Sequence, residues 1–348
     1  MALLDVRNVS IEYTTEDGVL KAVEDVSFSL EVGESVGLVG ESGCGKTTLA
    51  KSVMRLLSKN GRISEGQMMF KGEDLVTKSE EEIRKLRLKE IAMVAQSAMN
   101  ALNPVYTVGD QLIEGIQIHT DMSREQARER AIEVFKMVGL EAKRLKSYPH
   151  QMSGGMKQRA IIAMALTLNP SLIIADEPTT ALDVVVQDRI LQQVIEIQKK
   201  INSSMILITH DISVVSETCE TIIVMYGGKV MEKASTKAFF TKPVHPYSLG
   251  LNNAFPSIHE IGEELISIPG SPPNLMQKQV GCRFRARCPF RTEICMEEQP
   301  PLEEVAPNHF SACHHNKEVE RFREESQKRE TWEKVRERII EEIRRDVS

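Results

Sequence analysis

The chain has 348 residues, of which 41% are hydrophobic and 27% are charged, and its formal net charge is −6. This length and composition are typical of a globular protein with one large or two ordinary domains, and the acidic balance gives no reason to expect a nucleic-acid partner. The longest apolar runs, such as residues 161–166, are too short to cross a bilayer. The N-terminus lacks the basic and apolar stretches of a signal peptide, so we expect a cytosolic protein whose membrane role would come through a partner.

The first 30 residues alternate between apolar and polar positions in short runs at residues 3–9 and 22–30, with Asp17-Gly18 between them. This alternation predicts an antiparallel β-ribbon. An apolar strand follows at residues 35–39, and a helical pattern over residues 46–57 comes after a glycine-rich turn. A strand, a turn and a helix in this order form half of a βαβ unit.

The glycine-rich turn reads Gly-Glu-Ser-Gly-Cys-Gly-Lys-Thr over residues 40–47 and matches the phosphate-binding motif G-x-x-x-x-G-K-[ST]. Its glycines let backbone N–H groups converge on phosphate oxygens, and the helix N-terminus adds a favourable dipole. Lys46 is expected to reach the β- and γ-phosphates, Thr47 to ligate Mg²⁺, and Thr48 to donate to the α-phosphate. The same helix N-terminus could lower the pKa of the Cys44 thiol. The nucleotide-binding residues expected here are Gly40, Ser42, Gly43, Cys44, Gly45, Lys46, Thr47 and Thr48.

The pattern is mainly helical from residue 99 to residue 168, and two short apolar runs follow at residues 172–175 and 205–209. Continuous apolar runs of this length are typical of central parallel strands that are buried on both faces. Residues 183–200, between the two runs, have a helical pattern. The first 250 or so residues therefore predict an α/β fold with a helical insert.

Two carboxylates, Asp176 and Glu177, follow the first of these strands. The carboxyl end of a buried strand is where ligands bind in open α/β sheets. Phosphoryl transfer needs a metal held from a second side and a positioned water. We therefore expect Asp176 to hold Mg²⁺ through its hydration shell and Glu177 to polarise the attacking water.

Residues 153–159 read Ser-Gly-Gly-Met-Lys-Gln-Arg and stand before the strand that ends in Asp176 and Glu177. This segment resembles the signature motif of ABC-type ATPases, and the other motifs of that family are present in order over residues 1–250. Tyr13 matches the aromatic residue that stacks on adenine, Gln96 the Q-loop glutamine, Asp183 the D-loop aspartate and His210 the switch histidine.

The resemblance implies a P-loop NTPase of ABC type, with a RecA-like core, an antiparallel β subdomain and a helical signature subdomain at about residues 97–168. It implies ATP and Mg²⁺ as cofactors, with Thr47, Gln96 and Asp176 at the metal, and Glu177, His210 and Gln96 as catalytic residues. Ser153, Gly154 and Gly155 would bind the γ-phosphate of an ATP held by a second ATPase subunit, because a serine and two glycines that open a helix form an anion site.

Residues 96–109 and 148–159 are similar to the ATP-binding subunits of oligopeptide and dipeptide importers, although Ser97 and Ala98 replace a common acidic residue and proline. This likeness implies a homologous ATPase partner, two transmembrane permease subunits and an extracytoplasmic solute-binding protein, with the chain on the cytoplasmic face of the membrane. Members of the branch that import oligosaccharides or nickel remain alternatives. A soluble ABC ATPase is a third, although the chain has one ATPase domain and no long coiled-coil insert.

Four of the six cysteines lie within residues 282–313, in a proline-rich segment that resembles the appended module of peptide-importer ATPases. Four thiolates can hold zinc or an iron–sulfur cluster, and their spacing matches neither zinc knuckles nor ferredoxins. The resemblance favours [4Fe–4S] over zinc or a metal-free module. His309, His314 and His315 are either substitute ligands or solvated. Arg283, Arg285, Arg287 and Arg291 could offset a cluster's charge, and the expected ligands are Cys282, Cys288, Cys295 and Cys313.

The last stretch, residues 317–348, contains ten basic and ten acidic side chains. Trp332, Val335, Ile339 and Ile343 are spaced along one face of a helix. We expect either a solvated helix with one docked stripe or a helix that binds a partner. The predicted organisation is an ATPase domain at 1–255, a cysteine-rich module at 256–316 and this charged tail.

Overall fold

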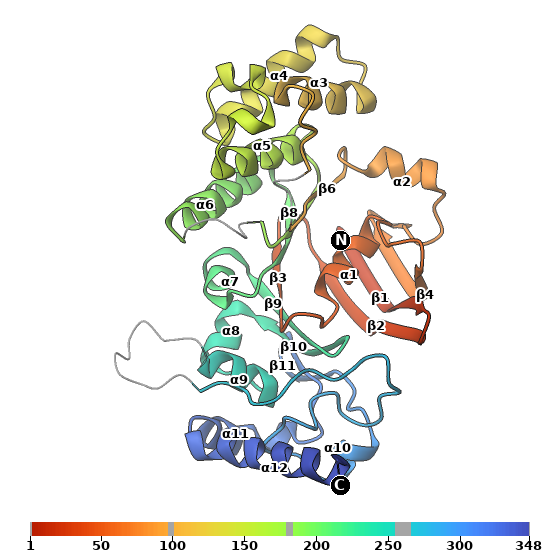
Figure 1. The fold of residues 1–348 in the computed structure, drawn as a ribbon, viewed down its shortest axis with the longest axis vertical. Helices are drawn as coiled ribbons and strands as arrows, with labels where there is room; N and C mark the ends of the chain where they lie inside the picture. The colour runs from red at the N-terminus through yellow and green to blue at the C-terminus, as the bar shows by residue number, and fades with distance from the viewer. Residues whose placement is uncertain (1, 97–100, 179–183, 255–265, 348) are drawn as a thin grey trace.

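The computed structural model describes residues 2–96, 101–178, 184–254 and 266–347. Figure 1 shows three regions along the long axis: helices α3–α5 at one end, a central sheet beside an antiparallel ribbon, and the C-terminal helices at the other end. The α/β architecture predicted from the sequence is confirmed. Ser97, Ala98 and Asp183 lie outside the described residues, as does the expected domain boundary at residue 255.

The N-terminal residues form the expected antiparallel ribbon, which a third and a fourth strand widen into a sheet of order β2-β1-β4-β5. Tyr13 pairs with Leu20 across the ribbon, and Thr15 pairs with Gly18 at its tip. The strands are β1 (Leu4–Thr15), β2 (Gly18–Leu30), β4 (Gly61–Phe70) and β5 (Glu73–Asp74).

The central sheet has the order β11-β12-β10-β9-β3-β8-β7-β6. Its strands from β9 to β6 are parallel to their neighbours, whereas β10, β12 and β11 pair antiparallel. The parallel strands are β3 (Ser35–Val39), β6 (Ile91–Val94), β7 (Leu172–Asp176), β8 (Ser204–Ile208) and β9 (Thr221–Tyr226). The antiparallel strands are β10 (Lys229–Ser235), β11 (Glu303–Ala306) and β12 (His309–Ser311).

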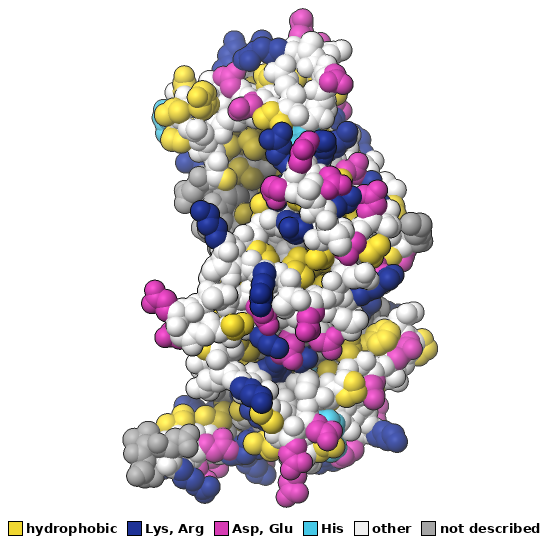
Figure 2. All heavy atoms as spheres, turned by 90° about the vertical axis from the view of Figure 1, so that its right-hand side faces the viewer, with side chains coloured by type: hydrophobic (Ala, Val, Ile, Leu, Met, Phe, Trp, Pro, Cys, Tyr) yellow, Lys and Arg dark blue, Asp and Glu magenta, His cyan; other side chains and the backbone are white. Residues whose placement is uncertain are grey.

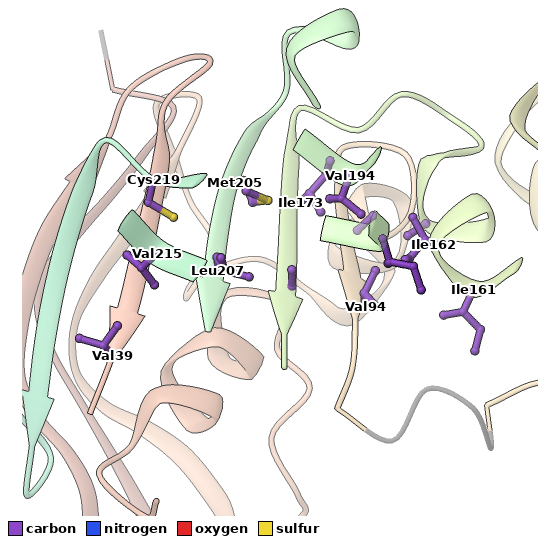
Figure 3. Packing of buried hydrophobic residues seen from close by; sticks show 14 of the residues in the cluster. Val39, Val94, Ile161, Ile162, Ile173, Val194, Met205, Leu207, Val215 and Cys219 are labelled. Carbon is purple, nitrogen blue, oxygen red and sulfur yellow. The ribbon is translucent and has the colours of Figure 1, made fainter. Parts of the chain in front are cut away.

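Both faces of the parallel strands are buried, as their continuous apolar sequences predict. Alternate residues of β8 belong to different cores: Met205 and Leu207 pack toward the helices, whereas Ile206 and Ile208 pack toward the ribbon. Figure 3 shows the helical side, with Met205, Leu207 and Ile173 on strands and Val215 and Val194 on covering helices. The parallel strands therefore lie between two hydrophobic cores, one on each face of the sheet.

Helices cover the sheet and build the insert between β6 and β7. Side-chain oxygens of Thr107, Ser123 and Ser153 cap the N-termini of the three insert helices. The insert helices are α3 (Val108–His119), α4 (Arg124–Met137) and α5 (Gly154–Leu166). The other helices before the C-terminal region are α1 (Lys46–Val53), α2 (Glu80–Leu86), α6 (Val184–Ile201), α7 (Ile212–Thr218), α8 (Thr236–Thr241) and α9 (Pro246–Asn253).

The C-terminal region packs against the central sheet and its covering helices. Phe284, Phe290, Phe322 and Trp332 are buried in the same core as the sheet-to-helix contacts. The short hairpin of β11 and β12 adds to the edge strand β10 of the central sheet. The helices of this region are α10 (Glu293–Glu297), α11 (Val319–Ser326) and α12 (Arg329–Val347).

The charged tail docks along one stripe. Trp332 and Val335 of α12 are buried, whereas Ile343 near its end is 58% exposed. This arrangement is the docked helix that was one of the two expectations from the sequence.

Among the residues that the structure describes, no helix combines the length and the apolar character that a membrane span requires. The face in Figure 2 carries basic and acidic side chains interspersed along its whole length.

Candidate active site

The phosphate-binding loop leaves the carboxyl end of β3 and enters α1, and two of its glycines are required by geometry. A Cβ atom at Gly40, which has φ +143°, would lie 2.1 Å from the Met225 carbonyl oxygen. At Gly45, which has φ +102°, a Cβ would lie 2.5 Å from the Ala22 carbonyl oxygen. Gly45 caps α1 with no side-chain hydrogen bond, so the first N–H groups of the helix are available for an anion.

Lys46 is folded back over the loop. Its Nζ donates to the carbonyl oxygens of Gly40 at 2.7 Å and of Glu41 at 2.9 Å. The ammonium group is therefore held beside the N–H groups of α1, where phosphate oxygens would meet both.

Cys44 lies beneath the loop and is 2% exposed, with its sulfur 3.5 Å from the Lys46 Nζ. Burial raises the pKa of this thiol, and the nearby Lys46 opposes that effect only in part. The lowered pKa that a helix N-terminus could produce is therefore not found, because desolvation of the thiolate is the largest effect on this group.

The predicted magnesium ligands meet where α1 faces the end of β7. The Thr47 hydroxyl donates to Oδ1 of Asp176 at 3.0 Å. Asp176 is buried, and burial raises the pKa of its carboxyl group while the bond from Thr47 opposes the shift. A hydroxyl and a carboxylate at this separation fit Mg²⁺, which prefers oxygen ligands and would favour the ionised form of Asp176.

Glu177 stands between two polar side chains from neighbouring strand ends. Gln96 Nε2 donates to Oε2 of Glu177 at 2.6 Å, and His210 Nδ1 lies 3.5 Å from Oε1. The backbone of Glu177 has φ +46°, an uncommon value for a residue with a side chain. The N–H of Glu177 donates to Ile208 at 2.8 Å, which anchors this conformation to β8.

These groups surround one cavity of ≈ 430 Å³, a volume within the usual range for small-molecule sites. Nine of the residues predicted from the sequence line it: Tyr13, Ser42, Gly43, Gly45, Lys46, Thr47, Thr48, Gln96 and Glu177. Gly40, Cys44 and Asp176 lie beneath or beside the cavity rather than in its lining, and His210 reaches it through Glu177.

Five further residues line the same cavity and were not expected from the sequence. Leu20 and Ala22 come from β2, next to Tyr13 in the ribbon. Pro273, Asn274 and Leu275 come from the C-terminal region. That stretch has no periodic pattern, so only the folded structure could reveal them.

The signature segment lies apart from this cavity. Ser153 and Gly154 are exposed at the N-terminus of α5, and the Ser153 Oγ accepts from the Met156 N–H at 3.4 Å. Gln158 of the same segment is buried and donates to the carbonyl oxygen of Pro178, next to Glu177. The segment thus exposes the N-terminus of α5, while its buried Gln158 contacts the residue that follows Glu177.

A second pocket in the C-terminal region is lined by Cys282, Cys288, Cys295 and Cys313, together with Arg285, His314 and His315. Burial raises the pKa of Cys282 to about 11 and that of Cys313 to about 12. Within the described ranges, no group of three or more His, Cys, Asp or Glu side chains is arranged so that it could hold a metal ion.

Most of the polar residues expected around a cluster have other partners. Arg283, Arg287 and Arg291 form ion pairs with Glu24, Glu41 and Glu342, which leaves Arg285 as the arginine of this set that lines the cysteine pocket. His309 is neither solvated nor at the pocket: it is buried, with Nε2 2.7 Å from Oε1 of Glu232. These pairings need partners more than 50 residues away in the chain, and no local pattern signals them.

Comparison with known proteins finds similar proteins over most of the chain. Residues 23–180 match the family model "ABC transporter", and residues 231–295 match "Oligopeptide/dipeptide transporter, C-terminal region". The chain is 46% identical to the oligopeptide transport ATP-binding protein OppD of Escherichia coli, over 90% of this chain and 93% of that protein. It is 44% identical to the dipeptide transport ATP-binding protein DppD of Bacillus subtilis, over 89% and 94% of the two chains.

Two solved structures with lower sequence identity are also similar to part of the chain. A dimeric ATP-binding cassette in a post-hydrolysis state with ADP and phosphate superposes with a TM-score of 0.61 at 30% identity. It covers 67% of this chain and 98% of its own. The protein cbiO1 of Clostridium perfringens, part of the ABC transporter complex cbiONQ, has a TM-score of 0.60 at 27% identity, over 72% and 95% of the two chains.

Proposed function

The chain belongs to the ABC transporter family of ATP-binding subunits, and on that premise we propose that it is the ATP-hydrolysing motor of an importer for di- and oligopeptides. The observation that carries this proposal is the single cavity in which Lys46 and Thr47 face Gln96 and Glu177. Phosphate, metal and attacking water would all need to meet at such a place.

Each side chain has a distinct task in the proposed reaction. Lys46 and the N–H groups of α1 would bind the phosphates, and Thr47 with Asp176 would hold Mg²⁺, which would neutralise negative charge on the phosphates. Glu177 accepts a proton from the attacking water while Gln96 fixes its carboxylate. His210, beside Glu177 and 74% exposed, would contact the γ-phosphate.

The site is completed by a second ATPase subunit. Ser153 and Gly154 are exposed and do not line their own chain's cavity, so they are available to the ATP of a partner. The similar dimeric cassette supports this arrangement. Two ATP molecules would hold the subunits together, and loss of the γ-phosphate would let them part, which drives a conformational cycle. We propose that the second ATPase subunit is a homologous protein and not a second copy of this chain.

The solute is inferred from the relatives. Those named here transport oligopeptides or dipeptides, and the C-terminal match is to a region of that transporter type. The partners would then be two transmembrane permeases and an extracytoplasmic binding protein, with this chain at the cytoplasmic face of the membrane. Importers of oligosaccharides or nickel and a soluble ABC ATPase are the alternatives that the experiment below separates.

We also propose that Cys282, Cys288, Cys295 and Cys313 hold a [4Fe–4S] cluster that stabilises the C-terminal module. Their shared pocket supports this proposal, since four thiols are the donor set of such a cluster. Zinc and a metal-free module are the alternatives.

Anaerobic purification tests the cofactor. Brown protein with about four iron and four sulfide per chain is expected, and Cys288→Ser should lose both. Cys219→Ser, which removes a buried thiol outside the pocket, is the matched control. Colourless protein with one zinc per chain would refute the cluster.

Reconstitution tests the transport function. The chain is co-expressed with candidate ATPase and permease partners, placed in vesicles, and supplied with binding proteins loaded with peptide, oligosaccharide or nickel. We expect the binding protein loaded with peptide to stimulate ATP hydrolysis, and the binding proteins loaded with oligosaccharide or nickel to leave it unchanged. Stimulation by another loaded protein, or co-purification of the chain from detergent extract in a complex without any integral membrane protein, would exclude the peptide importer.

A further inference from the structure

The segment formed by residues 268–275 approaches the nucleotide cavity from the C-terminal region. Three of its residues, Pro273, Asn274 and Leu275, are in the cavity lining together with Tyr13 and Lys46. The wall of the proposed ATP site is therefore built from both ends of the chain.

Several contacts fix this segment in place. Arg287 Nε donates to the carbonyl oxygen of Pro269 at 2.8 Å, and its Nη2 donates to that of Ile268 at 3.2 Å. A Cβ atom at Gly270 would lie 2.9 Å from the Cδ1 of Ile339, so α12 packs directly on the segment. The residues before Pro273 are thus held by both the module and the tail.

The position of the segment along the ribbon follows from two contacts. Pro273 packs on the turn between β9 and β10, since a Cβ at Gly227 would lie 3.1 Å from its Cγ. That turn also lies close to Ala22 through Gly228. Three residues later, Met276 Sδ lies 4.0 Å from the Thr15 hydroxyl at the ribbon tip.

The paired residues Tyr13 and Leu20 lie between these two contact points on the ribbon. Pro273, Asn274 and Leu275 therefore flank the end of the cavity that holds Tyr13, away from the metal pair Thr47 and Asp176. A nucleotide whose phosphates occupy the loop has its base and ribose at that end.

The three side chains suit a base or a ribose. Pro273 and Leu275 are half-buried and apolar, which suits the face of an aromatic ring. Asn274 Oδ1 accepts from the Met276 N–H at 3.0 Å. The amide nitrogen of Asn274 donates no hydrogen bond within the part of the chain that the structure describes, so it can donate to a ring nitrogen or a ribose oxygen.

We infer that Pro273, Asn274 and Leu275 bind the nucleoside half of ATP, so that the C-terminal region contributes directly to nucleotide affinity. This inference rests on the ATP site proposed above. On this inference the nucleoside is bound by the C-terminal segment as well as by Tyr13.

Calorimetric titration of the full-length protein with ADP and with pyrophosphate tests this inference, because the two ligands differ by the nucleoside. Asn274→Ala and Leu275→Asp should each weaken ADP binding by about threefold to tenfold, the effect of one lost contact. Pyrophosphate affinity should change by less than about twofold. Lys278→Ala, an exposed change in the same stretch, should leave both affinities unaltered.

The other outcomes are also decisive. An equal loss for ADP and pyrophosphate would show that the segment only holds the phosphate loop, and unchanged ADP affinity would show that it does not touch the nucleoside. Either result overturns the inference while the ATP site stands. If the wild-type protein binds neither ligand, or Lys46→Ala binds both normally, the phosphate site itself is wrong.

Discussion

The guanidinium group of Arg287 holds the carboxylate of Glu41 through two hydrogen bonds, from Nη1 at 2.7 Å and from Nη2 at 2.9 Å. Glu41 is the second residue of the phosphate-binding loop, and Arg287 precedes Cys288. The Tyr247 hydroxyl accepts from the Glu41 N–H at 3.0 Å, which fixes the loop backbone from the same side. The cysteine module is thus bonded to the loop expected to bind ATP.

Arg287→Ala should weaken both folding and nucleotide binding. Arg287 is 3% exposed in its side chain, and removing one partner of a buried pair leaves the other charge without compensation. Because Glu41 is partly exposed, we expect a loss of about 2 kcal/mol in the free energy of unfolding, measured by urea denaturation, and a lower affinity for ATP. Arg291→Ala, which breaks the more exposed pair with Glu342, should cost less than about 1 kcal/mol. Equal losses of unfolding free energy in the two variants would show that the buried pair with Glu41 stabilises the fold no more than the exposed pair with Glu342.

Glu177→Gln should bind ATP normally and stop turnover. The substitution keeps the shape of the side chain but removes the proton acceptor, and general-base catalysis contributes about 10²–10⁴-fold in rate. Phosphate release and ATP binding measured on the same preparation separate the two effects. Glu90→Gln, a change at a carboxylate bonded to Ser171 and Lys71, should hydrolyse ATP at the normal rate. Steady-state hydrolysis by the Glu177→Gln protein within tenfold of wild type would show that Glu177 is not the general base.

Ser153→Arg should abolish ATP hydrolysis by the assembled pair while each chain still binds ATP. The large cationic side chain would occupy the exposed helix start that faces the partner's γ-phosphate. The substitution also removes the N-cap of α5, which costs about 1 kcal/mol. Ser123→Arg removes the equivalent cap of α4 and controls for that loss. ATPase activity that falls equally in both variants would indicate a folding effect rather than a shared site.

Cys44 and Cys219 should resist alkylation in the native protein at mildly alkaline pH. Burial raises the pKa of both thiols, to about 12 for Cys219, so the reactive thiolate is scarce and inaccessible. Peptide mapping after iodoacetamide treatment should find both modified only in denaturant. Rapid modification of native Cys44 that ATP prevents would instead show an activated thiol in the loop.

The sequence was most informative where a pattern has a local cause. The glycine-rich loop, the apolar runs of β7 and β8 and the alternation of β1 and β2 each determine their own backbone, and the structure confirms all of them. The helix predicted over residues 46–57 ends at Val53. The motif residues converge because they follow neighbouring strands of one sheet.

The sequence was least informative about contacts between distant segments. The hydrogen bonds from Arg287 to Glu41 and from Arg283 to Glu24 join residues that are 246 and 259 positions apart, and the arginines had been expected around a cluster. The strands β11 and β12 have only four and three residues, too few for a periodic signal. Burial, which reverses the expected pKa shift of Cys44, is also a property of the folded chain alone.

The pairing of β12 with β10 has a consequence for synthesis of the protein. Glu232 of β10 is fully buried and lies opposite Ser311. Its carboxylate is bonded to His309 of the C-terminal hairpin, which is synthesised later. At a ribosomal rate of about 5–20 residues per second, the edge of β10 stays open for on the order of five to fifteen seconds before its partner emerges. During that interval the nascent ATPase exposes an unpaired strand edge, so we expect it to depend on chaperones until the last part of the chain has been made.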